Sequence, residues 1–332
     1  MTDTRFDVTG IGNAIVDIIG RCDDAYLAKI GAAKGSMRLV DAAGIAAIYD
    51  GMGPATEVSG GSAANTLAGV ASLGGRAGFI GTIADDEFGR IFTHDIQSIG
   101  VSFASKPVAG MLPTSRSLIL VTPDSERTMN TFLGISTNFD AAQLDRQMIR
   151  DSAILYLEGY LFDREDAKGA FREAVTEAKR AGRKVALSLS DGFCVDRHRT
   201  EFLTLIRSGV DILFANESEI NSLYETQQFD TASQHARNDA KLAVLTRSAK
   251  GSVIVSGEQT ISIPAERIIK VVDTTGAGDL YAAGFLFGVS KGLSLETSGK
   301  LASLAAAEII SHIGARPAIS LANLARERGL VK

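Results

Sequence analysis

The stretch Val271-Val272-Asp273-Thr274-Thr275-Gly276-Ala277-Gly278-Asp279, which continues into a helix of small and apolar residues, decides the fold. Its pattern predicts the end of a strand, a turn with two glycines and a helix start. The free N–H groups of a first helical turn and the helix dipole both favour negative charge. Gly276 and Gly278 let the backbone approach a ligand, and Asp279 falls in the first turn. The stretch therefore predicts an anion site beside a carboxylate; a purely structural helix start is the alternative.

Composition excludes several classes of protein. The chain has 332 residues, 45% hydrophobic and 22% charged, which is typical of globular proteins with one or two domains. Its net charge of -5 disfavours nucleic acid as a partner. Cys22 and Cys194 form no CxxC pair, which argues against disulfides and structural zinc and favours the cytoplasm. No apolar run approaches the roughly 18 residues of a membrane span. Small molecules are the expected partners.

A second glycine turn opens a helix earlier in the chain. Ser59–Gly75 opens with a glycine turn, continues with small residues and closes with a glycine pair, with Asn65 in the first helical turn. Upstream, Phe6–Asn13 predicts a first strand that ends in a glycine turn. It fails as a dinucleotide fingerprint because Ile15 stands where a glycine is needed, which disfavours a dehydrogenase.

Strands and helices alternate regularly after Asp140, and this pattern predicts a mainly parallel sheet with helices on both faces. Ligands bind beyond the carboxyl ends of such strands. The turns expected along that edge lie at Gly10, Gly60, Tyr160, Asp191, Asn216, Thr246 and Asp273. Short strands between Val101 and Phe132 have no helix between them and predict a meander. We expect a large α/β domain (1–13, 51–98 and 136–332) and a small β lid (14–50 and 99–135).

Three motifs together resemble the ribokinase/PfkB family of carbohydrate and nucleoside kinases. They are Gly60–Asn65, Asn216-Glu217-Ser218-Glu219 and Asp273–Asp279, in the family's order, and the resemblance spans nearly the whole chain. It implies a ribokinase-like fold, with a three-layer α/β/α domain and a β lid. It also implies transfer of the γ-phosphoryl group of ATP to a hydroxyl. No P-loop is present, so ATP must be held by other means.

The resemblance assigns catalytic roles around the glycine turn. Asp279 matches the base, which accepts the hydroxyl proton as the bond to phosphorus forms. The N–H groups around Gly276, Ala277 and Gly278 would stabilise charge on the transferred group. Contacts to ATP are implied for Arg127, Asn216, Thr246, Gly251 and Thr275. A solvated strand charge is the alternative for Arg127. Ser248 replaces the first glycine of the family's T-x-G-x-x-G loop, so the contacts from Thr246 and Gly251 stay open.

The resemblance to the family implies two cation-binding sites. Asn216 and Glu219 would act on Mg²⁺ through its waters; a helix capping box is the alternative, and both can hold. Some members of the family also build a monovalent-cation (K⁺) site near Asp273, Thr275 and Gly314. The oligomeric state, monomer or homodimer, stays open.

The acceptor site is implied by a second set of residues. Asp17 matches the aspartate that binds two sugar hydroxyls, and its neighbours there are Asn13, Gly60, Gly61 and Asn65. Gly10–Asp17, Glu158–Phe162 and Ile313–Pro317 resemble the adenosine kinase branch. Tyr160 could stack on a purine or be a core tyrosine. We therefore expect the 5′-hydroxyl of adenosine or another purine nucleoside, and a role in purine salvage. The alternatives are a fructokinase, ribokinase or 2-keto-3-deoxygluconate kinase, and a non-catalytic nucleotide- or sugar-binding module.

Overall fold

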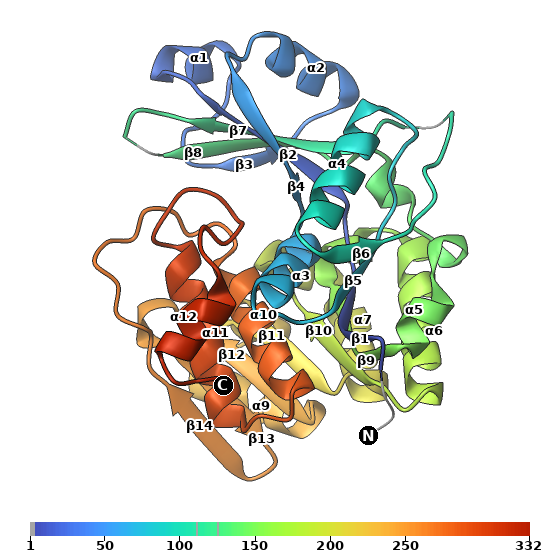
Figure 1. The fold of residues 1–332 in the computed structure, drawn as a ribbon, viewed down its shortest axis with the longest axis vertical. Coiled ribbons are helices and arrows are strands. Elements are labelled where there is room, and N and C mark those ends of the chain that lie inside the picture. Colours follow the sequence, from blue (N-terminus) through green and yellow to red (C-terminus); the bar gives the residue numbers. More distant parts are fainter. Residues whose placement is uncertain (1–3, 111, 125) are drawn as a thin grey trace.

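The described residues form two β-sheets, one of nine strands and one of five (Figure 1). The computed structural model describes residues 4–110, 112–124 and 126–332. The large sheet has the order β14 (Gln259–Ile263), β13 (Ser252–Ser256), β12 (Leu242–Thr246), β11 (Ile212–Asn216), β10 (Lys184–Ser188), β9 (Ser152–Glu158), β1 (Phe6–Ile11), β5 (Ala77–Ile80) and β6 (Val101–Phe103). The small sheet has the order β3 (Met37–Leu39), β8 (Arg127–Phe132), β7 (Ser115–Val121), β2 (Ile15–Arg21) and β4 (Ala55–Gly60).

Helices cover both faces of the large sheet, which runs parallel except where β13 and β14 join antiparallel. One face carries α3 (Ser62–Ser72), α10 (Ala277–Ser290), α11 (Leu295–Ile309) and α12 (Leu321–Glu327). The other carries α5 (Arg146–Arg150), α6 (Glu165–Arg180), α7 (Gly192–Gly209), α8 (Glu217–Leu223) and α9 (Phe229–Asp239). Short 3₁₀ turns lie at η1 (Gly134–Asn138), η2 (Ala141–Gln143), η3 (Gly159–Asp163) and η4 (Ser248–Lys250).

Alternation along the strands creates two separate cores. In β9, Ile154 and Tyr156 belong to one core, and Leu155 and Leu157 belong to the other. Successive side chains of a strand point to opposite faces, so each face receives its own apolar set. The predicted three-layer α/β/α architecture with a mainly parallel sheet is confirmed.

Glycines bring α10 close to its neighbours. A Cβ atom on Gly284 would lie 2.6 Å from the Cα of Ala302 in α11, and one on Gly69 of α3 would lie 2.6 Å from the Cβ of Ala283. The middle of α10 therefore packs closely against both α3 and α11. Burying a side chain such as Leu280 or Phe285 contributes about 1.5–3 kcal/mol, which anchors the helix that carries Asp279.

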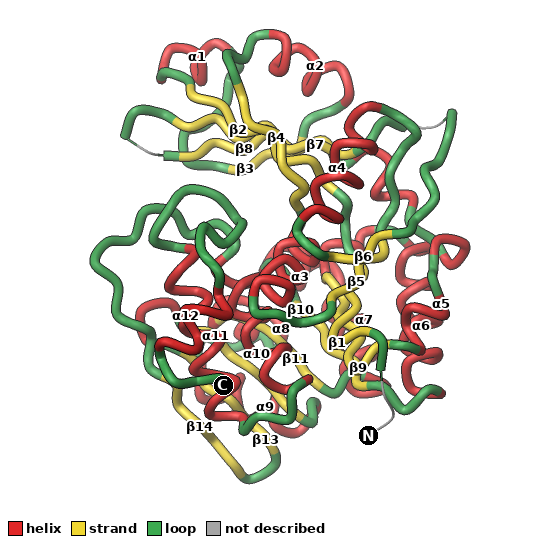
Figure 2. Tube along the Cα trace, in the orientation of Figure 1, coloured by secondary structure: helices red, strands yellow, loops and turns green. Residues whose placement is uncertain are grey.

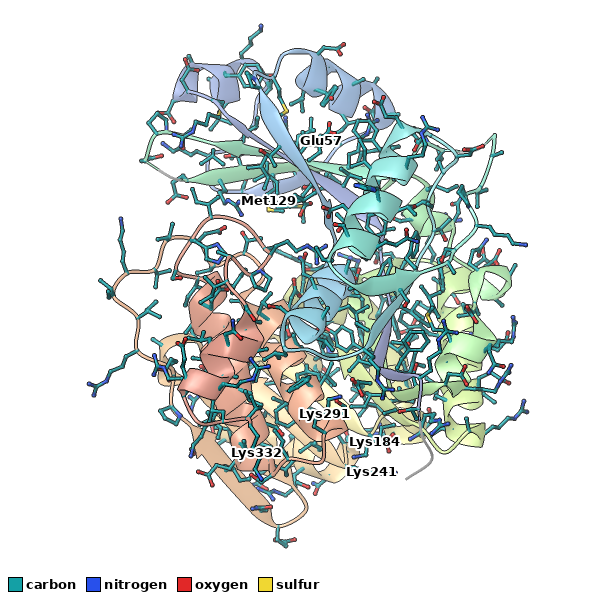
Figure 3. The ribbon with its side chains drawn as sticks, in the orientation of Figure 1. Glu57, Met129, Lys184, Lys241, Lys291 and Lys332 are labelled. Carbon is teal, nitrogen blue, oxygen red and sulfur yellow. The ribbon has the colours of Figure 1, made fainter. Side chains whose placement is uncertain are left out.

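Helices α1 (Asp24–Lys29) and α2 (Ala42–Asp50) lie over the small sheet, and α4 (Glu87–Ser98) packs beside β4 (Figure 1). The loops near the C-terminus face the opposite side of this sheet (Figure 2). Met129, labelled in Figure 3, lies on that side. Arg127 precedes Met129 by two residues in β8 and shares its face. No helix in the described ranges is long and apolar enough to cross a membrane.

Strand pairing corrects three expectations from the sequence. β4, expected in the large domain, pairs with β2 of the small sheet. β6, expected in the small sheet, pairs with β5 because its buried Phe103 packs against Phe79 and Phe92. The expected strand end at Val271-Val272 is absent, because the N–H of Val272 donates to the Ile310 carbonyl (2.8 Å) in a neighbouring loop.

Candidate active site

The carboxyl ends of five neighbouring strands meet along one edge of the large sheet. β1, β9, β10, β11 and β12 run parallel to one another, so their ends point the same way. The residues at or just beyond these ends include Asn13, Tyr160, Asp191, Asn216 and Thr246. Asp279 comes to this region from the first turn of α10.

Asp279 joins the starts of two helices. One carboxylate oxygen accepts a hydrogen bond from the Ser62 hydroxyl (2.6 Å), and the other accepts one from the Asn65 amide nitrogen (3.1 Å). Burial raises the pKa of Asp279 above its usual range, against the lowering effect of these bonds and of the Arg316 charge. The amide oxygen of Asn65 is buried and has no donor among the described residues. It is therefore free to accept a hydroxyl.

The start of α10 presents free N–H groups. Gly276 adopts a φ of 78°, and the Ala277 N–H donates back to the Thr274 carbonyl (3.2 Å). The carboxylate of Asp273 accepts the Thr275 N–H (3.0 Å) and so fixes the turn. Within the described chain, the N–H groups of Gly276 and Gly278 donate to no residue. Two of the three expected donors are thus free for an anion, and the third closes the turn.

Asp17 lies against the glycine pair that precedes α3. A Cβ atom on Gly60 would lie 2.3 Å from the Asp17 carboxylate, and one on Gly61, whose φ is 97°, would lie 2.2 Å from the Asn13 carbonyl. Burial raises the pKa of Asp17 to about 6, while Arg316 and then Arg127 lower it and Asp279 raises it. No described residue donates a hydrogen bond to the Asp17 carboxylate. Its oxygens are available for hydroxyl groups.

Glu158 is a site residue that the sequence reasoning missed. Its carboxylate accepts the backbone N–H (3.2 Å) and side-chain amide (2.7 Å) of Asn13 and the N–H of Ala63 (2.8 Å). The side chain is only 1% exposed, and burial raises its pKa to about 7 against the effect of these bonds. Glu158 therefore orients Asn13 and the start of α3. The available signal was a carboxylate that ends an otherwise apolar buried strand.

Tyr160 stands outside the core. The residue is 40% exposed, and its hydroxyl donates to the Ser190 carbonyl (3.1 Å). Ser190 adopts a φ of 69°, a conformation that non-glycine residues rarely take, and its hydroxyl accepts the Gly159 N–H (2.8 Å). The ring is held at the strand edge and is partly exposed, so the alternative of a core tyrosine is wrong.

Asn216 and Glu219 form the capping box that was the alternative to metal binding. The Glu219 carboxylate accepts the N–H (2.9 Å) and the amide nitrogen (2.6 Å) of Asn216, whose amide oxygen accepts the Glu219 N–H (2.9 Å). Burial raises the pKa of Glu219 to about 7, and the nearby Asp191 adds to the effect. Glu219 has no ion-pair partner in the described ranges. These ranges also contain no cluster of three or more His, Cys, Asp or Glu side chains able to hold a metal.

Arg127 reaches the glycine turn from the small sheet. Its guanidinium lies 2.5 Å from the Asp273 carboxylate, and the two side chains are 7% and 5% exposed. None of its nitrogens makes a hydrogen bond of good geometry to a described residue. A solvated strand charge is therefore excluded. The same carboxylate also accepts the Gly314 N–H (3.0 Å), so Asp273, Thr275 and Gly314 lie together, with the carboxylate turned toward N–H donors.

The loop after β12 is a tight turn closed by a backbone hydrogen bond. Arg247 donates its N–H to the Gly251 carbonyl (2.7 Å). Gly251 has a φ of 81°, and a Cβ there would lie 2.1 Å from the Ile263 carbonyl. Ser248, at the position of the family's first glycine, adopts a φ of 50°. Ser248 therefore holds, at the expense of strain, a left-handed conformation that glycine adopts readily.

The architecture and the site together define a ribokinase-like small-molecule kinase, a phosphotransferase with a hydroxyl acceptor. The chain belongs to the pfkB family of carbohydrate kinases, whose model matches residues 51–321.

Solved relatives cover nearly the whole chain. Adenosine kinase from Sinorhizobium meliloti is 53% identical, with a TM-score of 0.90 over 98% of this chain and 99% of that chain. A probable sugar kinase from Rhizobium etli is 49% identical, with a TM-score of 0.92 over 99% and 100% of the two chains. Adenosine kinase of Saccharomyces cerevisiae is 28% identical over 92% of this chain and 94% of its own. The predicted resemblance to the adenosine kinase branch is confirmed.

Ser248→Gly is expected to stabilise the protein. A left-handed conformation is unfavourable for a residue with a Cβ by about 1–2 kcal/mol, and the greater freedom of glycine in the unfolded chain offsets about 0.4–1 kcal/mol. Urea denaturation should show a net gain in the free energy of unfolding of about 0.5–1 kcal/mol. Ser256→Gly in strand β13 is the control and should lower stability. Equal destabilisation by both substitutions would contradict the strain at Ser248.

Proposed function

We propose that this protein transfers the γ-phosphoryl group of ATP to the 5′-hydroxyl of adenosine or another purine nucleoside. The observation that carries the proposal is Asp279, which Ser62 and Asn65 hold beside the free N–H groups of the α10 turn. The two adenosine kinases among its relatives support the choice of acceptor. This activity would belong to purine salvage in the cytoplasm.

Asp279 acts as the base in this proposal. A sugar hydroxyl is a much weaker acid than a carboxylic acid, so Asp279 takes the proton while the acceptor oxygen bonds to the γ-phosphorus. The bond from that phosphorus to the oxygen bridging the β- and γ-phosphates breaks, and ADP leaves. The raised pKa of Asp279 makes its carboxylate a stronger base. Ser62 and Asn65 orient its two oxygens before the reaction.

Fixed hydrogen-bond donors would stabilise the negative charge on the transferred phosphoryl group. The N–H groups of Gly276 and Gly278 point from the positive end of α10. Arg127, which is ion-paired with Asp273 through one nitrogen, has two further guanidinium nitrogens without a hydrogen-bond partner among the described residues. Such donors stabilise developing negative charge without reorganisation. We assign the remaining contacts with ATP to Asn216, Thr246, Gly251 and Thr275.

The donor set near Glu219 fits a divalent cation held through water. The carboxylate is 6% exposed and lies near Asp191 without an ion-pair partner in the described ranges. Because both of its oxygens already accept hydrogen bonds from Asn216, we propose that Glu219 and Asn216 contact the waters of Mg²⁺ rather than the ion. When bound, Mg²⁺ would neutralise part of the phosphate charge.

The acceptor lies between Asp17 and Tyr160 in this proposal. Two ribose hydroxyls can donate to the unpartnered Asp17 carboxylate, and a further hydroxyl can donate to the free amide oxygen of Asn65. Gly60 and Gly61 leave room at the backbone, and Glu158 holds Asn13 at the side. The open ring of Tyr160 then stacks on the base. The small sheet, as a lid, would keep water from the phosphate.

A sugar kinase is the second candidate. A free furanose also offers the hydroxyl pair that Asp17 would bind, and the solved relative from Rhizobium etli is a probable sugar kinase. The catalytic residues would be the same for both candidates, and only the acceptor molecule that carries the reacting hydroxyl would differ.

A panel of acceptors tests the proposal directly. ADP release would be measured with Mg·ATP and adenosine, guanosine, ribose, fructose or 2-keto-3-deoxygluconate. We expect turnover of a purine nucleoside, with kcat/KM for every free sugar lower by roughly 100-fold or more because the base contact is absent. Turnover with free sugars alone would establish the sugar kinase. Binding of a nucleoside or sugar without any turnover would establish a non-catalytic module.

Tyr160→Ala should weaken use of adenosine more than use of ribose. Aromatic stacking contributes about 0.5–1.5 kcal/mol, so KM for adenosine should rise roughly two- to twelve-fold. Tyr160→Phe is the matched control: it keeps the ring, loses only the bond to Ser190 and should stay near the wild-type value. Steady-state kinetics with both acceptors would decide. Equal effects of Tyr160→Ala on the two acceptors would remove Tyr160 from base recognition.

A further inference from the structure

Arg316 donates hydrogen bonds to both sides of the junction between the two sheets. It lies in the loop between α11 and α12, and its guanidinium donates to the carbonyl (3.0 Å) and the hydroxyl (2.8 Å) of Ser59 and to the carbonyl of Ala64 (2.7 Å). Ser59 belongs to β4 of the small sheet, and Ala64 lies in the first turn of α3 beside the large sheet. Gly60 and Gly61 lie between them. One planar side chain therefore fixes the backbone on either side of two glycines.

The loop that carries Arg316 is itself anchored. The buried Glu308 carboxylate accepts the N–H groups of Ala318 (2.9 Å) and Ile319 (3.3 Å) after Arg316. The Gly314 N–H before it donates to Asp273 (3.0 Å). The backbone is thus anchored on both sides of Arg316.

The charge of Arg316 is not neutralised by a direct ion pair. In the described part of the chain its hydrogen bonds go to neutral oxygens, and no carboxylate lies within ion-pair distance. Asp17, Asp95 and Asp279 lie close enough to raise its pKa against the effect of burial, which lowers it to about 10. Arg316 is therefore charged at neutral pH, among three carboxylates, two of which the proposed reaction uses.

Ser59 connects Arg316 to the third carboxylate. Asp95, in α4, accepts both the N–H (2.7 Å) and the hydroxyl (2.6 Å) of Ser59. The Ser59 oxygen that donates to Asp95 also accepts from Arg316. Charge-assisted hydrogen bonds of this kind are stronger than neutral ones, so the chain Arg316–Ser59–Asp95 stiffens the end of β4 where it enters the glycine pair.

We propose that Arg316 is a positioning residue for phosphoryl transfer: it clamps the Gly60–Gly61 junction and sets one positive charge between the acceptor-binding Asp17 and the base Asp279. This rests on the proposed function. Asp17 also faces Arg127, and Asp279 also faces Ser62, Asn65 and Arg316. The negative charge of Asp279 in turn acts on the buried Glu158 and Tyr156. Among these groups, Arg316 is the positive charge that both Asp17 and Asp279 share.

Carboxyl titration by NMR tests the charge without any substrate. Aspartate would be labelled with ¹³C in the full chain, and Asp17 and Asp279 assigned with Asp17→Asn and Asp279→Asn. In Arg316→Gln both pKa values should rise above those of the wild type, because a positive charge is lost. Arg207→Gln removes a charge on an exposed helix, where Arg207 pairs with Asp239, and should leave both unchanged. Unchanged pKa values in Arg316→Gln would overturn the proposal.

Arg316→Lys separates the charge from the clamp. Lysine keeps the charge but cannot reproduce the planar fork, so the two carboxyl pKa values should stay near those of the wild type. The kcat/KM for the accepted substrate should still fall about tenfold or more, because the glycine junction loosens. Wild-type kcat/KM in this variant would overturn the clamp, and it remains informative if Arg316→Gln fails to fold.

A pH profile distinguishes the proposal from a merely structural role. In Arg316→Gln the acidic limb of kcat/KM should move to higher pH, and in Arg316→Lys it should stay in place. A uniform loss of activity at every pH in Arg316→Gln would contradict a role for the charge. If nucleosides are not phosphorylated at all, the proposed function fails, while the titration still decides whether Arg316 controls the two carboxylates.

Discussion

The site depends on the contact between the first turns of α3 and α10. Ser62 and Asn65 of α3 donate to the carboxylate of Asp279 in α10, and the two segments are more than 200 residues apart in sequence. Each helix follows a glycine with a positive φ, Gly61 and Gly276. Two positive helix ends therefore converge on one carboxylate. Hydrogen bonds hold the Asp279 carboxylate in place, and the two helix ends stabilise its negative charge. The carboxylate can therefore orient a hydroxyl group while the same helix ends stabilise negative charge on a phosphate.

The small sheet adds the groups that α3 and α10 lack. β2 carries Asp17 to the glycine pair, and β8 carries Arg127 to Asp273 at the α10 turn. Both side chains approach the large sheet from outside it, and Arg316 ties the connecting glycines to the start of α3. In the proposed function, the junction between the sheets would therefore couple acceptor binding to phosphate binding.

Local motifs were predictable because glycines and carboxylates at fixed spacing have few structural solutions. Gly60, Gly61, Gly276 and Asp279 all occupy the positions that the sequence indicated. The sequence does not indicate roles for Glu158 and Arg316, because their partners lie 145 and 257 residues away and no local pattern marks such contacts.

The sequence also assigned β4 and β6 to the wrong sheets. Their pairing partners are set by tertiary packing between distant segments rather than by strand propensity. At Ser248, by contrast, the residue type does not indicate the backbone conformation. There the backbone keeps a conformation typical of glycine although the residue is a serine, and only the resemblance to the family pointed to it.

The central claim is that Asp279 takes the proton of the acceptor hydroxyl. The most direct measurement is the kcat of Asp279→Asn with the preferred acceptor, together with the Kd of that acceptor from calorimetry. General-base catalysis contributes about 10²–10⁴-fold, so kcat should fall by at least about 100-fold while Kd changes only slightly. A variant that binds its acceptor normally and keeps near-normal kcat would contradict the account.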